Sequence, residues 1–305
     1  SVGAGIPLIQ SIHDGLAANN IQSIYGIVNG TTNYILTRML KDKKDFKEVL
    51  KDAQKNGYAE SNPAFDVDGV DSAHKLAILA SICFDTVVKL EDIYVEGISR
   101  ITRKDITDAR EEFGCFIKLL AIGREENGEI DVRVHPTLIS EDHLLADVDD
   151  VYNAIYVVGD AVGPVMFYGQ GAGQMTAASA VVSDIIYIAR NIRSGVAGKV
   201  PSVFYEDGKP LKKVKNILDL RTRYYLRFTV LDQPGVLASI SGILGKFGIS
   251  ISSLIQKEEK KGGKVPVVMM TYEAEERNIK AALEEVDKLP IIKEKTLAIR
   301  MEKGE

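Results

Sequence analysis

The stretch 57–75 constrains the fold of this chain more than any other part of the sequence. Four acids crowd into a segment rich in turn-forming residues: Glu60, Asp66, Asp68 and Asp71. Lys75 closes the segment, and the apolar run 76–80 follows it at once. If a helix starts near Asp71, then Asp71 and Lys75 lie four residues apart on one face. Apolar residues line the rest of such a helix, so the chain must bury most of it.

The surroundings of Lys75 favour a specific task for that lysine. Ile78, Leu79 and Ile82 continue its face of the helix, so we expect the Asp71–Lys75 pair at a buried edge. A lysine held there needs a defined partner, because an unpaired buried charge is costly. Such a place suits a proton-transfer group. A salt bridge at a helix start explains the same spacing, and the residues alone leave both interpretations open.

A longer pattern runs through the same stretch. It consists of Ala53-x-x-x-Gly57-Tyr58-Ala59, Asn62-Pro63, Asp66-Val67, Gly69, Asp71 and Lys75. The pattern resembles, without gaps, the signature of homoserine dehydrogenases. The resemblance implies reversible, NAD(P)-dependent interconversion of L-aspartate 4-semialdehyde and L-homoserine, in the biosynthesis of threonine, methionine and isoleucine. It also implies that Lys75 is the proton donor and acceptor at the substrate oxygen.

The resemblance assigns the residues around the substrate as well. The acids at Glu60 and Asp71 would hold the substrate's amino group, with Asp66 as a further contact. From the residues alone, 29–34 is an Asn-Gly turn followed by a threonine cap on a helix over 34–39, which suits an anion. A motif like it lines the family's pocket between substrate and nicotinamide. This implies substrate contacts for Gly30, Thr31 and Tyr58, and a cofactor contact for Asn29.

A glycine-rich turn, 169–174, follows a predicted strand and precedes a helix predicted over 177–190. It lacks the third glycine and the later acid of a dinucleotide fingerprint, which argues against an independent Rossmann unit here. The resemblance gives Gly171 and Gly173 a smaller role. The turn would let the backbone approach the nicotinamide end of NADP or NAD.

The opening residues 1–7 resemble the family segment that follows its nucleotide-binding domain. We therefore expect the chain to be the C-terminal part of a longer enzyme and to turn over little by itself. In the family, backbone carbonyls matching Val2, Ala4 and Ile6 bind a monovalent cation, Na⁺ or K⁺. A plain glycine-rich entry loop to the helix predicted at 8–18 is the alternative.

Residues 223–305 predict a second domain. Strands at 224–230, 249–256, 265–272 and 295–300, with helices ending at 247 and spanning 275–287, give the order βαββαβ. The turn at 232–237 resembles that of ACT domains, regulatory modules that pair and bind amino acids. The resemblance implies threonine as effector near Asp232, Gly235 and Val236, because exposed amides at a helix start suit a carboxylate. A purely structural pairing module is the alternative.

The predicted fold class is α+β. We expect a mixed-sheet substrate and dimerisation domain over 1–200, a linker over 201–222 and a ferredoxin-like ACT domain over 223–305, in line with a length of 305 residues. Asn127-Gly128 predicts a hairpin in the strand-rich part of the first domain. The resemblance further implies a homo-oligomer, at least a dimer. A non-catalytic amino-acid sensor built on the ACT domain is the alternative function.

Composition excludes several other classes of protein. A net charge of −5 argues against a nucleic-acid surface. No apolar run is long enough to span a membrane, and no signal peptide is recognisable. The four histidines lack ligand spacing, so a zinc site is not expected. Cys83 and Cys115 lie far apart in apolar surroundings, which predicts reduced thiols and a cytoplasmic protein.

Overall fold

The computed structural model describes residues 2–198, 211–257 and 263–302 and divides into two compact units. Unit 1 comprises Ser1–Ile106, Lys118–His135 and Leu144–Lys215. Unit 2 comprises Thr107–Ile117, Pro136–His143 and Asn216–Glu305. In this part of the chain, none of the helices is long and apolar enough to cross a membrane.

Unit 1 is built on a mixed sheet with the strand order β6-β5-β1-β3-β4, beside which β2 and β7 each pair in parallel with β4. The strands are β1 (Ile21–Ile27), β2 (Tyr94–Val95), β3 (Cys115–Glu126), β4 (Glu129–Ser140), β5 (Tyr152–Gly159), β6 (Gly163–Gln170) and β7 (Lys213–Val214). Asn127 and Gly128 both adopt positive φ between β3 and β4. This is the backbone of a two-residue hairpin turn, so the predicted hairpin is confirmed.

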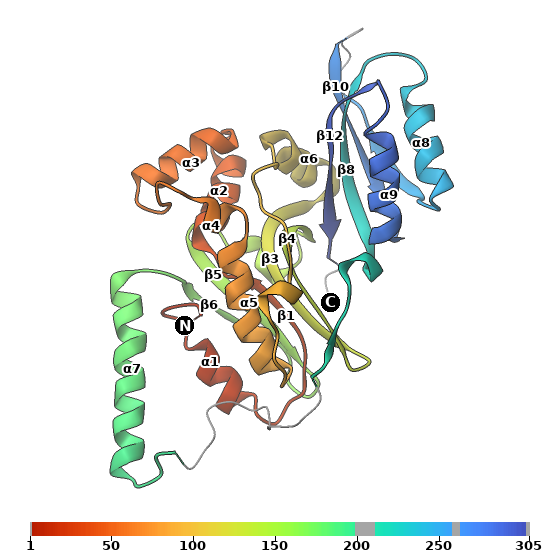
Figure 1. The fold of residues 1–305 in the computed structure, drawn as a ribbon. Helices are drawn as coiled ribbons and strands as arrows, with labels where there is room; N and C mark the ends of the chain where they lie inside the picture. The colour runs from red at the N-terminus through yellow and green to blue at the C-terminus, as the bar shows by residue number, and fades with distance from the viewer. Residues whose placement is uncertain (1, 199–210, 258–262, 303–305) are drawn as a thin grey trace. The chain divides into compact units, whose positions relative to one another are not determined.

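The sheet of unit 1 is flanked by helices (Figure 1). They are α1 (Leu8–Gln10), the π-helical η1 (Ser11–Gly15), α2 (Gly30–Lys41), α3 (Phe46–Lys55), α4 (Ala64–Val67), α5 (Val70–Cys83), η2 (Leu90–Asp92), η3 (Leu144–Asp147) and α7 (Gln174–Arg193). Helix α6 (Arg103–Phe113) begins in unit 1, and most of its residues belong to unit 2. The end of α5 packs on the sheet, because a Cβ at Gly123 would lie 3.0 Å from the Phe84 ring. Asp105 helps to start α6, since the Thr102 N–H donates to its Oδ2 at 2.8 Å.

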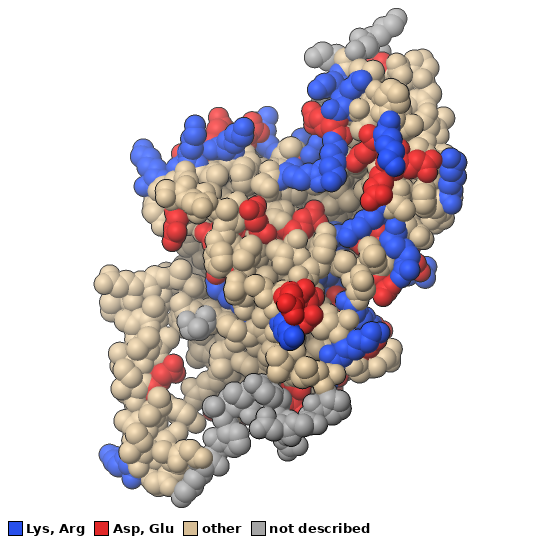
Figure 2. Space-filling model, in the orientation of Figure 1, with Lys and Arg blue, Asp and Glu red and all other residues tan. Residues whose placement is uncertain are grey.

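Two helices of unit 1 differ from expectation. The cap of α2 is Asn29 rather than a threonine, because Asn29 Oδ1 accepts from Thr32 N at 2.9 Å, and the helix begins at Gly30. The helix α7 is longer than predicted and extends away from the sheet with no buried residue. Its surface is mostly uncharged (Figure 2), and it exposes large apolar side chains such as Met175 and Ile192.

The structure describes only part of the expected linker, 201–222. Its residues 201–210 lie outside the described residues. The remainder is ordered, since β7 pairs with β4 and the 3₁₀ turn η4 (Ile217–Asp219) leads into the next strand. Both cysteines are free thiols, as predicted, and burial raises the pKa of each.

Unit 2 contains the predicted βαββαβ order. Its elements are β8 (Arg221–Leu231), α8 (Val236–Lys246), β9 (Ile251–Ile255), β10 (Lys264–Thr271), the short β11 (Ala274–Glu275), α9 (Glu276–Val286) and β12 (Ile292–Met301). The four long strands form an antiparallel sheet in the order β12-β8-β10-β9. Helices α8 and α9 bury Ile240, Leu244 and Ile279 together with Phe228 and Val267 of the sheet. This is the ferredoxin-like arrangement expected from the sequence.

A charged group lies inside unit 2. Glu276 is 2% exposed, and its Oε2 accepts hydrogen bonds of 2.8 Å from Tyr224 Oη and from Arg300 Nε. Burial by itself raises the pKa of this carboxyl, but the hydrogen bonds and the charge of Arg300 hold the pKa below its usual value. The ion pair therefore stabilises the fold only while Glu276 is ionised.

Replacing Glu276 by glutamine should lower the free energy of unfolding by about 3 kcal/mol, because Arg300 then stays buried without its counter-charge. Urea unfolding at neutral pH measures this. The matched control is Lys280→Met, which removes the half-exposed partner at 3.6 Å from the same carboxylate and should cost less than about 1 kcal/mol. Equal losses in the two variants would contradict the assignment.

The same pair predicts a pH dependence. The folded pKa of Glu276 is depressed, so its contribution is present above the unfolded pKa of about 4.3 and is lost as the pH falls through the folded pKa. Wild-type stability should therefore fall more steeply with acid than that of Glu276→Gln.

Candidate active site

Helix α5 carries the acid and the lysine singled out by the sequence. It starts after Gly69, whose φ of +85° turns the chain into the helix. One turn later, Lys75 Nζ lies 2.6 Å from Asp71 Oδ2, with both side chains 21% exposed. Lys75 Nζ also donates to the Val28 carbonyl, just after β1, at 2.8 Å. The lysine is therefore fixed between helix and sheet.

Asn29 ties two acids to this lysine. Its Nδ2 donates to Asp66 Oδ1 at 2.7 Å and to Asp71 Oδ2 at 2.8 Å. Both amide hydrogens are used in this way, while Oδ1 caps α2 through Thr32. Asn29 is 5% exposed, so its side chain acts as a buried bridge. Its predicted contact with a cofactor stays a prediction.

The charges of the cluster are unequal. Asp66 and Asp71 bring two carboxylates, and Lys75 brings one ammonium. In the described structure, the second oxygen of each carboxylate has no hydrogen bond from protein. A ligand with a positively charged group would balance the excess negative charge and could use those oxygens.

The predicted buried face of α5 beside Lys75 is partly wrong. Leu79 is buried, but Ile78 is 44% exposed, so the face of Lys75 borders solvent instead of continuing as a buried edge. The exposed His74 lies on this rim, with its ring centroid 5.6 Å from that of Phe65. Because the Lys75 side chain is 21% exposed, part of it can be reached from solvent.

The start of α2 is enclosed from two sides. Thr31 Oγ1 donates to the Tyr58 carbonyl at 2.6 Å, and the Tyr58 ring packs 5.0 Å from that of Tyr34. At Gly30 a Cβ would lie 2.8 Å from the Val151 carbonyl oxygen, so only glycine fits without a shift. The predicted residues Gly30, Thr31 and Tyr58 are thus neighbours.

The glycine turn before α7 meets the N-terminal segment. Gly5 N donates to the Gln170 carbonyl at 3.3 Å, and Gly173 adopts a φ of +131° at the helix start. A Cβ at Gly171 would lie only 1.8 Å from Asn153 Nδ2, so the turn passes directly over that buried side chain. The backbone itself is therefore the surface that Gly171 presents.

The residues expected to bind a cation lie in the same N-terminal turn. Ala4 has a φ of +38°, and the Ile6 carbonyl already accepts from Leu8 N at 2.7 Å. Among the described residues, no group of three or more histidine, cysteine, aspartate or glutamate side chains could hold a metal ion. That finding does not bear on a site made of the carbonyls of Val2, Ala4 and Ile6.

Other predicted residues are not joined to the cluster by hydrogen bonds. Glu60 is exposed, and its backbone carbonyl accepts from Gln54 Nε2 at 3.0 Å. In unit 2, Gly235 has a φ of +89° and precedes α8 without a side-chain cap, and Val236 is buried. Asp232 N donates to the Gly263 carbonyl at 2.9 Å.

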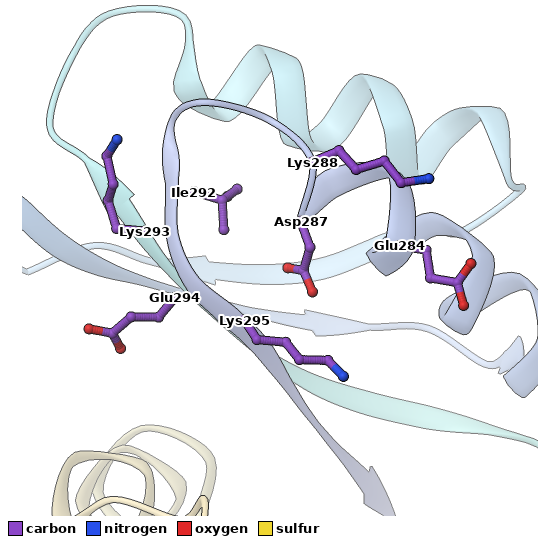
Figure 3. Close-up of a pocket in the computed structure, with 7 residues that line it drawn as sticks. All are labelled: Glu284, Asp287, Lys288, Ile292, Lys293, Glu294 and Lys295. Carbon is purple, nitrogen blue, oxygen red and sulfur yellow. The ribbon is translucent and has the colours of Figure 1, made fainter.

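A pocket of unit 2 does not coincide with that turn. The pocket has a volume of about 550 Å³. It lies between the end of α9 and the start of β12 (Figure 3). It is lined by Glu284, Asp287, Lys288, Ile292, Lys293, Glu294 and Lys295. Asp287 is already engaged, since its Oδ1 accepts from Thr296 N at 3.0 Å. None of the predicted effector residues lines this pocket.

The sequence did not reveal three groups near the site. The Val28 carbonyl carries no signal, because a backbone acceptor does not depend on residue type. Asn153 is 1% exposed, and its Oδ1 has no hydrogen-bond partner within the described structure. Lys118 is 3% exposed, and burial lowers its pKa. A lysine within the apolar run 116–122 was the one available hint of its burial.

Two family models match this chain. A model of the homoserine dehydrogenase family matches residues 7–186, and one of the ACT domain matches residues 224–291. The homoserine dehydrogenase of Synechocystis sp. is 45% identical over 306 residues, which cover 99% of this chain and 70% of that protein. The crystal structure of a homoserine dehydrogenase from Thiobacillus denitrificans is 42% identical with a TM-score of 0.90, covering 99% of this chain and 69% of that one.

A more distant structure contains a cofactor. It is a mutant of a hyperthermophilic archaeal homoserine dehydrogenase in complex with NADPH. It is 29% identical with a TM-score of 0.54 and covers 66% of this chain and 55% of that one.

Replacing Gly30 by alanine should destabilise the protein by about 1–3 kcal/mol, since the new methyl group meets the Val151 carbonyl oxygen at 2.8 Å. Thermal unfolding measures the loss. Gly15→Ala is the matched control, because no heavy atom lies within 4 Å of its added Cβ. A Gly30 variant as stable as this control would show that the fit at residue 30 is looser than described.

Proposed function

The chain belongs to the homoserine dehydrogenase family, and on that premise we propose that Lys75 is its general acid and base. Enzymes of this family interconvert L-aspartate 4-semialdehyde and L-homoserine with NAD(P). One observation carries the proposal. Among the described residues, Lys75 Nζ donates two hydrogen bonds, to Val28 O and Asp71 Oδ2. An ammonium has three N–H groups, so the third is left for a substrate oxygen.

The protein groups act on the proton at that oxygen. As the aldehyde is reduced, its oxygen gains negative charge and Lys75 gives it a proton. In the reverse direction, Lys75 takes the proton from the hydroxyl of homoserine. Asp71 and the Val28 carbonyl hold Nζ in place during both steps. NADP or NAD, when bound, supplies or accepts the hydride at the carbon.

The acids bind the other end of the substrate in this proposal. The oxygens of Asp66 and Asp71 that Asn29 leaves unused accept from the amino group of homoserine, and Glu60 adds a further acceptor. Gly30, Thr31 and Tyr58 form the wall beside it. The cluster's excess of one negative charge supports this orientation, because the amino group carries the matching positive charge.

The cofactor contacts are proposed at Asn29, Gly171 and Gly173. The turn fits such a role, because Asn153 fills the space that a side chain at Gly171 would need. A flat ring can therefore approach the backbone closely. The NADPH bound to the archaeal relative supports a nicotinamide cofactor here. We further propose Na⁺ or K⁺ at the carbonyls of Val2, Ala4 and Ile6, where the left-handed Ala4 turns the chain.

We also propose a function for each domain of the chain. Residues 1–200 carry substrate and dimer contacts, 201–222 link, and 223–305 regulate. Threonine would bind with its carboxylate on the backbone amides at the start of α8, near Asp232, Gly235 and Val236. The enzyme would act as a dimer or larger oligomer in the cytoplasm. No observation favours the alternative of a non-catalytic sensor, since the lysine–acid cluster is intact.

Replacing Lys75 by methionine should lower kcat roughly 10²- to 10⁴-fold in the active enzyme, because the general acid is lost. Steady-state oxidation of homoserine, followed by cofactor absorbance, measures the change. The control is Lys44→Met, which removes an exposed lysine that also lies 2.7 Å from an aspartate, and should leave kcat unchanged. Near-normal turnover of the Lys75 variant would refute the assigned role.

Threonine should bind the chain with millimolar affinity, measurable by titration calorimetry. Gly235→Ala should weaken binding about tenfold, because alanine is strained at a φ of +89° and shifts the amides of the turn. Gly242→Ala serves as control, since its added Cβ meets no heavy atom within 4 Å. The absence of heat up to saturating threonine would favour a purely structural ACT pair.

A further inference from the structure

The loop between η3 and β5 forms the floor beneath Gly30. The carbonyl oxygen of Val151, in this loop, lies 2.8 Å from the position that a Cβ of residue 30 would occupy. One of its residues, Asp150, adopts a φ of +56°, which a non-glycine side chain rarely accepts. A loop in this conformation persists only where its surroundings hold it.

Buried groups hold the loop from inside. The Nδ2 of Asn33, on α2, donates to the carbonyls of Val148 at 3.0 Å, Asp150 at 3.0 Å and Tyr152 at 3.2 Å. From β3, Lys118 Nζ donates to the same Val148 carbonyl at 2.6 Å. These carbonyls converge on an amide and an ammonium that are 2% and 3% exposed, respectively.

The carboxylate of Asp149 compensates the charge of Lys118. Its Nζ lies 3.4 Å from Asp149 Oδ1 and 3.5 Å from Asn33 Oδ1. Lys41, at the surface, contacts the other oxygen of Asp149 at 2.7 Å. Burying an ammonium carries a desolvation penalty that an apolar residue at position 118 would avoid. The buried charge therefore points to a task in holding the loop.

We propose that Lys118 is a positioning residue for substrate binding: through Val148 and Asn33 it fixes the loop 147–152 beneath Gly30. The first turn of α2 then keeps Gly30 and Thr31 at the right distance from the acid cluster that Asn29 bridges. This inference rests on the proposed function, because it assumes that the substrate lies between α2 and α5.

The test compares Lys118→Met with Lys41→Met in the active enzyme. Losing the buried ammonium should raise KM for homoserine on the order of tenfold, with kcat within about twofold, since binding rather than chemistry is disturbed. Amide hydrogen exchange should become faster at 148–152 and at 30–32. Lys41→Met removes the exposed partner of the same aspartate and should change neither quantity.

A second variant covers the case in which Lys118→Met does not fold. Thr37 Oγ1 accepts from Asp150 N at 3.1 Å and donates to Asp149 Oδ1 at 3.4 Å. Thr37→Val therefore loosens the loop while Lys118 keeps its ammonium and its bond to the Val148 carbonyl, and it should raise KM severalfold. Normal KM and normal exchange in the folded variants would overturn the inference, even if their melting temperatures fall. Because Lys75→Met tests the proposed function separately, a failure of one is distinguishable from a failure of the other.

Discussion

One carboxylate connects the parts of the candidate site. Asp71 Oδ2 accepts from Lys75 and from Asn29 at 2.6 and 2.8 Å, so the lysine, the cap of α2 and the acid of α4 share a single network. Each of these groups is at least half-buried, where electrostatic interactions are stronger than in water. Because Asn29 spends both amide hydrogens on acids, its removal would leave two carboxylates facing each other. The position of Lys75 therefore depends on residues from three separate segments.

Helix α2, which Asn29 caps, also holds the loop before β5. The first turn of α2 faces the acids, while Asn33 and Thr37 on its inner side hold the loop before β5. Glycine at position 30 brings these two layers into contact, since any side chain there would meet the loop. In so closely packed an interior, a change in the loop would have to be accommodated at Gly30.

Unit 2 is stabilised by different means. Its apolar core lies between one face of a four-stranded sheet and two helices, with a buried Glu276–Arg300 pair at the edge of that core. The desolvation of the two charges offsets much of their attraction, so the loss of one partner costs more than the intact pair contributes. The turn before α8 begins at Gly235, whose φ of +89° leads the chain into the helix without a side-chain cap from that residue.

The sequence alone predicted the Asn127-Gly128 hairpin, the βαββαβ order of the second unit and the Asp71–Lys75 pair. These follow from local rules: helical spacing, turn residues and the alternation of apolar side chains. It misjudged the face of Ile78 and the cap of α2, because exposure and cap choice depend on what packs nearby. Only the tertiary structure showed that Asn29 bridges Asp66 and Asp71, that the Val28 carbonyl holds Lys75 and that Lys118 is buried under the loop at 147–152. Those contacts join residues up to 47 positions apart around Lys75, and no local pattern encodes them.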